Sequence, residues 1–360
     1  MQLKFLQSLV VAACFSLPVS AQQTDAPVTT ILTAALEEYI RPAYEVLVTD
    51  TVKLAAAAKT LCDAPSEANL KAAQTAFKAG ASAWSKVEWF RVGSAMSNNR
   101  IERLFYFPDR KSTGLKQVQR ALLNQDQNAA NAETLMTKSV AMQGLGATEF
   151  LLFGDGSETL ANATGAYRCS YVLASAETTS AIAADLQLGW IDGSDAAQFW
   201  QTPAANNPYF RNDTEALNML IGTLIHGLEA VRDVRLGAFL GKTADSDKPK
   251  LAPYWRSETT FASIAANLEG LQTLYNQSGL VSALPSENAE LIRTIEFDFG
   301  QAIRTVKSLD TPVASVLSDN DLRREATYLK LTVQILIDHF NVEFAPAAGL
   351  AAGFSFGDGD

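Results

Sequence analysis

Apolar residues recur along most of the chain at spacings of three and four positions, the repeat that places side chains on one face of an α-helix. Between residues 66 and 91, for example, this stripe includes Leu70, Phe77 and Trp84. No alternating apolar run predicts a β-strand. The pattern predicts an all-α fold, with helices over residues 29–62, 66–91, 115–123, 132–153, 157–188, 212–240, 258–277, 287–308 and 319–343.

Turn-forming residues interrupt the helical pattern at 107–109, 154–156, 203–208, 241–253 and 284–285. Long helices joined by short loops are typical of up-and-down bundles. The stretch 190–208 is rich in Gly, Asp, Asn and Pro and is the best boundary between two halves. We therefore expect an N-terminal helical half over 22–190, a C-terminal helical half over 191–346 and an extended tail over 347–360.

Residues 1–21 have the composition of a signal peptide. Lys4 precedes an apolar run from Leu9 to Leu17, and small residues end at Ala21. In an alternative interpretation, residues 11–14 resemble a lipoprotein box and Cys14 carries a lipid. No other segment is long and charge-free enough to predict a transmembrane helix. We expect an exported, periplasmic protein, with lipid anchoring as the alternative.

Export would leave two cysteines, Cys62 and Cys169, in an oxidising compartment. They could form a disulfide or remain two separate buried thiols. A disulfide that closes a loop of about 100 residues would stabilise the fold by about 4–5 kcal/mol in the chain-entropy model.

The composition excludes several kinds of metal, redox and nucleic-acid site. The chain has 29 Lys and Arg against 39 Asp and Glu, a net charge of −10, and only two histidines. Three-histidine zinc sites and CxxC redox motifs are therefore excluded. An acidic chain without a basic cluster also argues against nucleic acid as a partner, because phosphate must be neutralised by Lys and Arg.

Glu149 is the first candidate functional residue, because it interrupts the apolar run in 143–154 (QGLGATEFLLFG) and should be buried. A buried carboxylate must be paired, protonated or bound to a metal. Arg91 continues a helical stripe and is expected to point inward as its partner, so a structural ion pair is an alternative to a metal site. Gly144 and Gly146 each cost about 1 kcal/mol within a helix, which indicates close packing or a kink.

A second candidate site is the pair His226 and Glu229, which are three residues apart and share a helix face, as metal-binding pairs on bundle helices do. Asp233 follows one turn later, and a cation would relieve its repulsion with Glu229. The alternative is a His–Glu hydrogen bond, with Arg232 pairing to Glu229. His339 lies near the predicted end of the last helix, where the helix dipole favours it.

Asp109 and Ser257 each precede a predicted helix and are interpreted as turn or N-cap residues.

Several segments, taken in order, resemble the imelysin-like family. The family motif Gly-x-His-x-x-Glu is matched here at Gly144 and Glu149, but Gly146 stands where the motif has histidine. The other resembling segments are 62–95 with Trp84 and Arg91, 107–110 with Asp109, 256–257 with Arg256 and Ser257, and the end of the chain at 353–360.

The resemblance implies two pseudo-symmetric helical-bundle halves with the motif near their interface. It also implies an exported envelope protein linked to iron uptake. Gly144, Glu149, Arg91, Trp84, Asp109, Arg256 and Ser257 would then contribute to the pocket. The pseudo-symmetry suggests that His226 and Glu229 lie near Glu149, where the three would bind iron or zinc.

The family is also classed with M75 metallopeptidases, and the absent histidine weakens that activity here. The sequence therefore favours a binding or accessory protein in iron or other metal uptake, with envelope proteins as further partners. Two alternatives stay open. One is a metal-dependent peptidase with Glu149 as general base, and the other is a metal-free module that binds a peptide or small ligand through Trp84, Arg91 and Arg256.

Overall fold

The computed structural model describes residues 27–350, and these residues form helices and turns with no β-strand among them. The all-α prediction is confirmed. The α-helices are α1 (Val28–Ala34), α2 (Arg41–Asp63), α3 (Glu67–Val87), α4 (Arg100–Leu104), α5 (Thr113–Asn124), α6 (Ala132–Leu135), α7 (Gly144–Phe153), α8 (Ala166–Leu188), α9 (Asp195–Gln201), α10 (Asp213–Glu229), α11 (Thr260–Gln277), α12 (Ala289–Ser308), α13 (Val313–Ser318), α14 (Asn320–Asp338) and α15 (Ala345–Ala347).

Three of the long predicted helices contain a π-helical segment. These segments are Ala35–Ile40, which joins α1 to α2, Ala230–Leu236 after α10, and His339–Phe344 after α14. The helix predicted over 132–153 is instead divided into α6, a 3₁₀ turn (Val140–Met142) and α7. Gly144, the first residue of α7, has a φ of +72°, which a continuous right-handed helix does not allow. The short helices α4, α9, α13 and α15 were not predicted.

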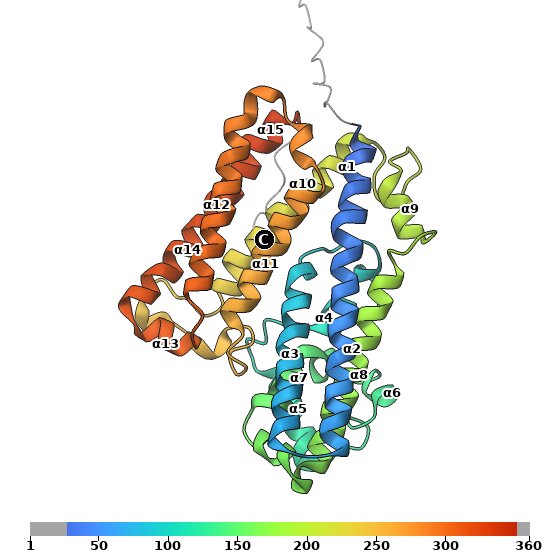
Figure 1. The fold of residues 1–360 in the computed structure, drawn as a ribbon, viewed down its shortest axis with the longest axis vertical. Helices are drawn as coiled ribbons and strands as arrows, with labels where there is room; N and C mark the ends of the chain where they lie inside the picture. The colour runs from blue at the N-terminus through green and yellow to red at the C-terminus, as the bar shows by residue number, and fades with distance from the viewer. Residues whose placement is uncertain (1–26, 351–360) are drawn as a thin grey trace, which may run out of the picture.

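The helices form two groups in Figure 1. In the first, α2 packs against α3 and α8, and α7 packs against α3 and α8. In the second, α12 packs against α11 and α14, and α10 contacts α11 and α14. The groups meet where α3 packs on α11 and where α1 contacts α10. The boundary at residue 191 and the pseudo-symmetry of the halves stay predictions.

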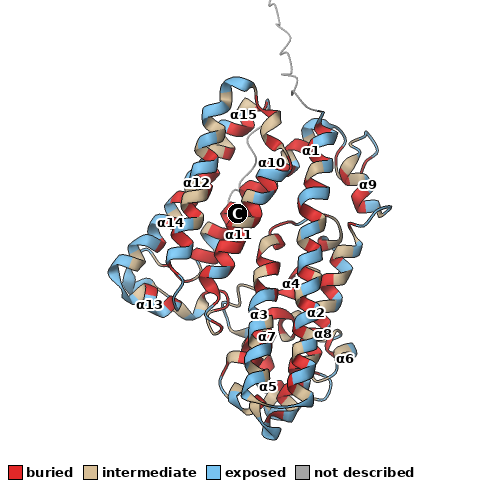
Figure 2. Ribbon diagram, viewed as in Figure 1, coloured by how far each residue is buried: buried red, intermediate tan, exposed pale blue. Residues whose placement is uncertain are grey.

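Both groups of helices carry buried residues (Figure 2), and the buried apolar residues of the two groups belong to one core. Trp84 lies in this core and is only 2% exposed. Its expected place in a ligand pocket is therefore wrong: the α3 stripe that carries Trp84 faces the protein interior, and the side chain lines neither of the cavities described below.

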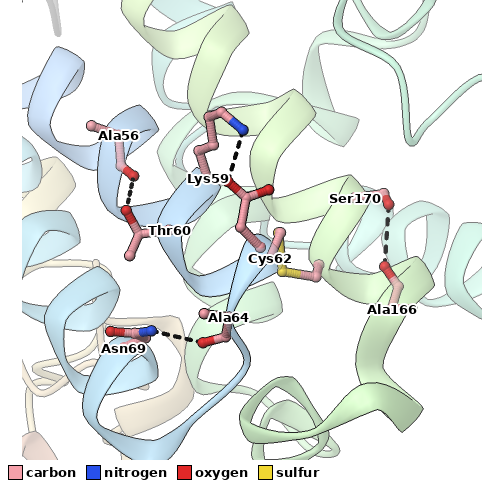
Figure 3. Close-up of a disulfide and its surroundings, with 10 residues drawn as sticks. Ala56, Lys59, Thr60, Cys62, Ala64, Asn69, Ala166 and Ser170 are labelled. Atoms are coloured by element: carbon pink, nitrogen blue, oxygen red, sulfur yellow. Dashed lines mark hydrogen bonds and ion pairs between the residues drawn. A yellow bond between two sulfur atoms is a disulfide. The ribbon is translucent and has the colours of Figure 1, made fainter.

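A disulfide joins Cys62 in α2 to Cys169 in α8 (Figure 3). The two Cα atoms are 5.5 Å apart and 107 residues separate the cysteines in the sequence. Of the two alternatives for these cysteines, the structure shows the disulfide, which links two neighbouring helices of the first group.

Among residues 27–350, no helix is long and apolar enough to cross a membrane. The predicted signal peptide (1–21), the alternative lipid site at Cys14 and residues 351–360 of the predicted tail lie outside the described residues. The tail predicted over 347–360 is not extended at its first residue, because Ala347 belongs to α15.

Candidate functional site

Glu149 is buried in α7, as predicted, and its partners come from the segment that precedes α11. Its Oε1 atom accepts hydrogen bonds from the backbone N–H of Arg256 (3.0 Å), the backbone N–H of Ser257 (3.0 Å) and the hydroxyl of Ser257 (2.9 Å). Burial raises the pKa of the Glu149 carboxyl, and the hydrogen bonds from Ser257 and the charge of Arg256 offset only part of this effect.

The backbone around Ser257 is shaped to donate to a carboxylate. Tyr254 and Glu258 have φ values of +53° and +58°, so the chain turns sharply on both sides of the two donating amides. The Tyr254 ring stacks on Phe105, with ring centroids 4.4 Å apart, which anchors this turn against the first group. Successive N–H groups in such a turn form a concave anion-binding nest. Ser257 lies in a turn, which is one of its two predicted roles, but it is not the N-cap of α11, because α11 begins only at Thr260 and the Ser257 hydroxyl is directed to Glu149.

Arg91 is exposed, so the expectation that it points inward to pair with Glu149 is wrong. The expectation extended the α3 stripe to residue 91, but α3 ends at Val87. Helical spacing therefore no longer determines the direction of the Arg91 side chain.

The two glycines of the motif are constrained differently. A Cβ atom at Gly144 would lie 2.1 Å from the carbonyl oxygen of Arg103, which confirms the close packing that the sequence indicated. A Cβ atom at Gly146 would meet only the Phe105 ring, at 3.8 Å. Space alone therefore does not explain the glycine at position 146.

Glu149 and Gly146 line a cavity of about 490 Å³, which we call the Glu149 cavity. One wall comes from residues 105–118 and α7, and the other from residues 237–256. Its lining includes four cationic side chains and several aromatic rings: Arg110, Lys248, Lys250 and Arg256, with Phe105, Phe107, Phe150, Tyr254 and Trp255.

Asp109 also lines the Glu149 cavity, but its carboxylate caps α5, as predicted. Oδ1 accepts from the N–H of Thr113 (2.6 Å), and Oδ2 accepts from the N–H groups of Gly114 (2.9 Å) and Leu115 (3.2 Å). Both oxygens are thus used within the protein.

His226 and Glu229 line a different cavity, of about 310 Å³, together with Arg91. The predicted contact within the pair is present, because His226 Nδ1 and Glu229 Oε2 are 3.1 Å apart. In the same cavity, Glu88 forms a buried ion pair with Arg235. Burial raises the pKa of the Glu88 carboxyl despite the opposing charge of Arg235.

The two cavities share the side chain of Phe107 in their linings, but Glu149 lines one cavity, and His226 and Glu229 line the other. Within residues 27–350, no group of three or more His, Cys, Asp and Glu side chains is arranged to hold a metal ion. The expected set of Glu149, His226 and Glu229 is therefore not brought together.

His339 is the C-cap residue of α14, as predicted, and π-helical turns continue from it to Phe344. Its ring lies between two carboxylates. Nε2 is 3.1 Å from Asp298 Oδ2, and Nδ1 is 2.6 Å from Glu343 Oε1.

A model of the imelysin family, peptidase M75, matches residues 40–337. The chain belongs to the imelysin family. The crystal structure of an imelysin-like protein from Psychrobacter arcticum 273-4 is similar, with a TM-score of 0.73 and 19% identity, over 92% of this chain and 99% of that chain. A Parabacteroides distasonis ATCC 8503 protein, described as an iron-regulated protein A precursor, is similar with a TM-score of 0.71 and 16% identity, over 89% and 96% of the two chains. These likenesses show the fold, and no curated protein matches.

The family is associated with metal-dependent peptidases, but the Glu149 cavity of this imelysin-family chain does not fit a metal ion. Gly146 supplies no ligand, and Oε1 of Glu149 and both oxygens of Asp109 are already used. The remaining charged residues of the lining are cations, which would repel a metal ion.

Sequence reasoning found Arg256 but missed Arg110, Lys248 and Lys250. The signal was present in two predicted breaks, since Arg110 follows 107–109 and Lys248-Pro249-Lys250 lies within 241–253. Nothing in the sequence alone indicated that these two breaks face each other.

Proposed function

We propose that this imelysin-family chain is an exported binding protein of the cell envelope that takes a small ligand into the Glu149 cavity and serves iron acquisition. Three facts support the proposal. The family model covers residues 40–337, one structural relative is described as an iron-regulated precursor, and residues 1–21 have signal-peptide composition.

The arrangement of Glu149 carries the proposal. Three donors hold Oε1, whereas the described residues provide no hydrogen bond to Oε2, which is not among the fully buried polar atoms that lack a partner. Oε2 therefore keeps some exposed surface, and Glu149 lines the cavity. A rigidly held acceptor in a cavity of about 490 Å³ is typical of a small-molecule site, because the protein loses little freedom on binding.

A complementation experiment tests this function. A deletion strain of the source organism should grow more slowly than the parent on iron-chelated medium and recover with the wild-type gene. Glu149→Gln should restore growth only partly, whereas Glu45→Gln, an exposed substitution on α2, should restore it fully. Blots of cell fractions would establish equal expression and an envelope location. Normal growth of the deletion strain, or full recovery with Glu149→Gln, would overturn the proposal.

One observation favours the peptidase alternative. A general base works best when its pKa is near the working pH, and burial raises the pKa of Glu149. Incubation with a peptide library, read by mass spectrometry, tests this directly. Cleavage by the wild type that disappears in Glu149→Gln and persists in Glu45→Gln would replace the binding function with a peptidase.

The third alternative, a pocket made of Trp84, Arg91 and Arg256, lacks such support. Of these residues only Arg256 lines the Glu149 cavity, since Trp84 is in the core and Arg91 lines the other cavity.

A further inference from the structure

Four cations line the Glu149 cavity without a salt bridge to any residue that the structure describes. The side chains of Arg110, Lys248, Lys250 and Arg256 make no hydrogen bond or ion pair to any residue within 27–350, in a chain whose net charge is −10. Arg256 instead lies over the Trp255 ring, with its guanidinium carbon 4.3 Å from the centroid. Cations without salt bridges that line one cavity of an acidic protein indicate an anionic ligand.

The two acids of this cavity form no salt bridge with the four cations, although the charges of Glu149 and Arg256 attract each other. Asp109 directs both oxygens to the amides that begin α5, and Glu149 directs Oε1 to the amides and hydroxyl at 256–257. Neither carboxylate bonds to one of the four cationic groups, and this leaves the cations for a ligand.

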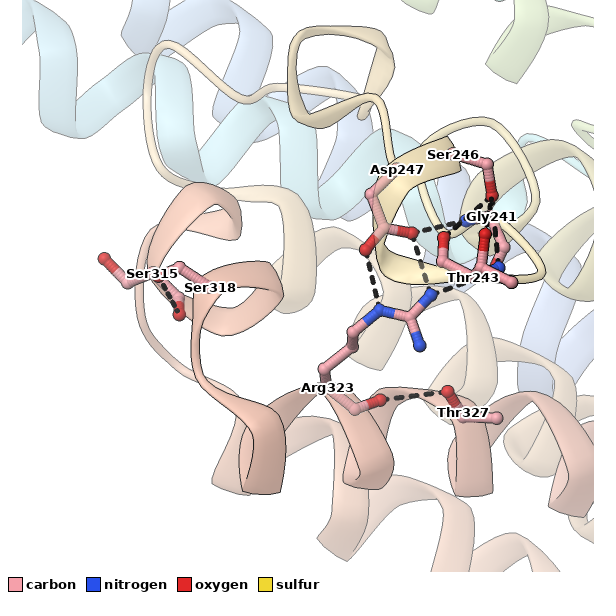
Figure 4. A network of polar contacts seen from close by, with 8 residues as sticks. All are labelled: Gly241, Thr243, Ser246, Asp247, Ser315, Ser318, Arg323 and Thr327. Atoms are coloured by element: carbon pink, nitrogen blue, oxygen red, sulfur yellow. Dashed lines mark hydrogen bonds and ion pairs between the residues drawn. The ribbon is translucent and has the colours of Figure 1, made fainter.

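The segment that carries the two lysines is held in place (Figure 4). Asp247 accepts from the Gly241 N–H at 2.7 Å and from Arg323 of α14 at 2.7 and 3.0 Å. Lys248 donates its backbone N–H to Phe239 at 2.8 Å. Asp247 is the acidic residue nearest to Lys248 in the sequence. Because it forms an ion pair with Arg323, it does not neutralise Lys248.

The residues that line the Glu149 cavity favour one class of anion over others. Arg256 offers the planar donor fork that carboxylates match in a bidentate fashion. Four separate cations suit a ligand with several carboxylates. Oε2 of Glu149 can only accept while the carboxylate is ionised, so it needs a ligand hydroxyl or a similar donor. We infer that the Glu149 cavity binds a small hydroxy-polycarboxylate, as the free anion or as its negatively charged ferric chelate.

This inference rests on the proposed binding function and names its ligand class. Isothermal titration calorimetry of the mature, disulfide-bonded protein tests it, with citrate, ferric citrate, tricarballylate, inorganic phosphate and Zn²⁺ alone as probes. Citrate or ferric citrate should bind. The double variant Lys248→Gln/Lys250→Gln should bind at least about tenfold more weakly, since each lost charge-assisted contact is worth about that factor. The charge-matched control Lys71→Gln/Lys330→Gln, away from the cavity, should change affinity less than about twofold.

Tricarballylate, which lacks the hydroxyl of citrate, isolates the contribution of Glu149. The wild type should prefer citrate, and Glu149→Gln should lose this preference while all variants keep their circular dichroism spectrum. Phosphate that binds as tightly as citrate, or lysine variants that bind like the control, would overturn the ligand class. Zn²⁺ binding without any polycarboxylate binding would overturn this inference and leave a binding function intact. The proposed function itself is tested by the growth and peptide-cleavage experiments, and the titration does not overturn it.

Discussion

Ser257 donates both its hydroxyl and its backbone N–H to Oε1 of Glu149, over 2.9 and 3.0 Å, although 108 residues separate the two in the sequence. Glu149 belongs to the first group of helices and Ser257 precedes α11 of the second. This contact therefore fixes the motif carboxylate and also joins the two groups across the Glu149 cavity.

Ser257→Ala should destabilise the protein by about 1.5–3 kcal/mol, because it removes a hydrogen bond to a buried carboxylate that keeps its two amide donors. Urea unfolding, followed by circular dichroism, measures the change. Ser170→Ala, which removes an exposed hydroxyl on α8, serves as the control and should cost less than about 0.5 kcal/mol. Equal losses in the two variants would show that the Ser257 hydroxyl contributes nothing specific.

Glu149→Gln should remove a pH dependence of stability. Burial raises the folded-state pKa of Glu149, so the folded protein binds a proton more tightly than the unfolded chain does. This tighter proton binding stabilises the folded protein. The stabilisation is fully present below the unfolded-state pKa of about 4.3 and is lost as pH rises through the raised folded-state pKa. The wild type should therefore lose unfolding free energy relative to Glu149→Gln as pH rises from about 4 to 8. Urea unfolding at both ends of this range measures it, and a constant difference would contradict the raised pKa. Glu88 is present in both proteins, so its contribution cancels.

The two motif glycines should respond oppositely to alanine. Gly144→Ala should cost at least about 2 kcal/mol, because the residue has a φ of +72° and its Cβ would lie 2.1 Å from the Arg103 oxygen. Gly146→Ala should stabilise the protein by about 0.5–1 kcal/mol, since α7 has room there and alanine favours a helix. Thermal unfolding of the two variants provides the comparison. A loss at position 146 as large as at position 144 would contradict the difference in packing.

Replacing the disulfide with Cys62→Ser/Cys169→Ser should lower the unfolding free energy by about 4–5 kcal/mol in the chain-entropy model, because the bond closes a loop of 107 residues. Urea unfolding of the variant, and of the wild type with and without dithiothreitol, tests this. The reduced wild type should match the variant. Unchanged stability in both would mean that the unfolded chain gains no freedom when the bond is absent.

Features that depend on residues close in the sequence were predictable. Helical spacing placed the long helices, the three-residue separation brought His226 to Glu229, and Asp109 caps the helix that follows it. For Cys62 and Cys169 the sequence left two alternatives open, a disulfide or two buried thiols, and the structure shows the disulfide.

Features that depend on packing between distant segments were not predictable. Arg91 was assigned to Glu149 by extending a helix that ends at Val87, and the true donors lie at 256–257. That Lys248 and Lys250 line the cavity became known only from the three-dimensional structure, because no local sequence pattern relates them to α7.

The Glu149 cavity takes one wall from residues 105–118 and α7 and the other from residues 237–256, so neither half of the gene encodes a complete site. A chimera that combines one half of this chain with the other half of a relative would inherit mismatched walls. The two halves of such a chimera would have to match in charge. In this chain the wall with the uncharged Gly146 faces the wall with Lys248 and Lys250. The two walls of the Glu149 cavity must therefore be kept together if the site is to keep the charge that suits an anionic ligand.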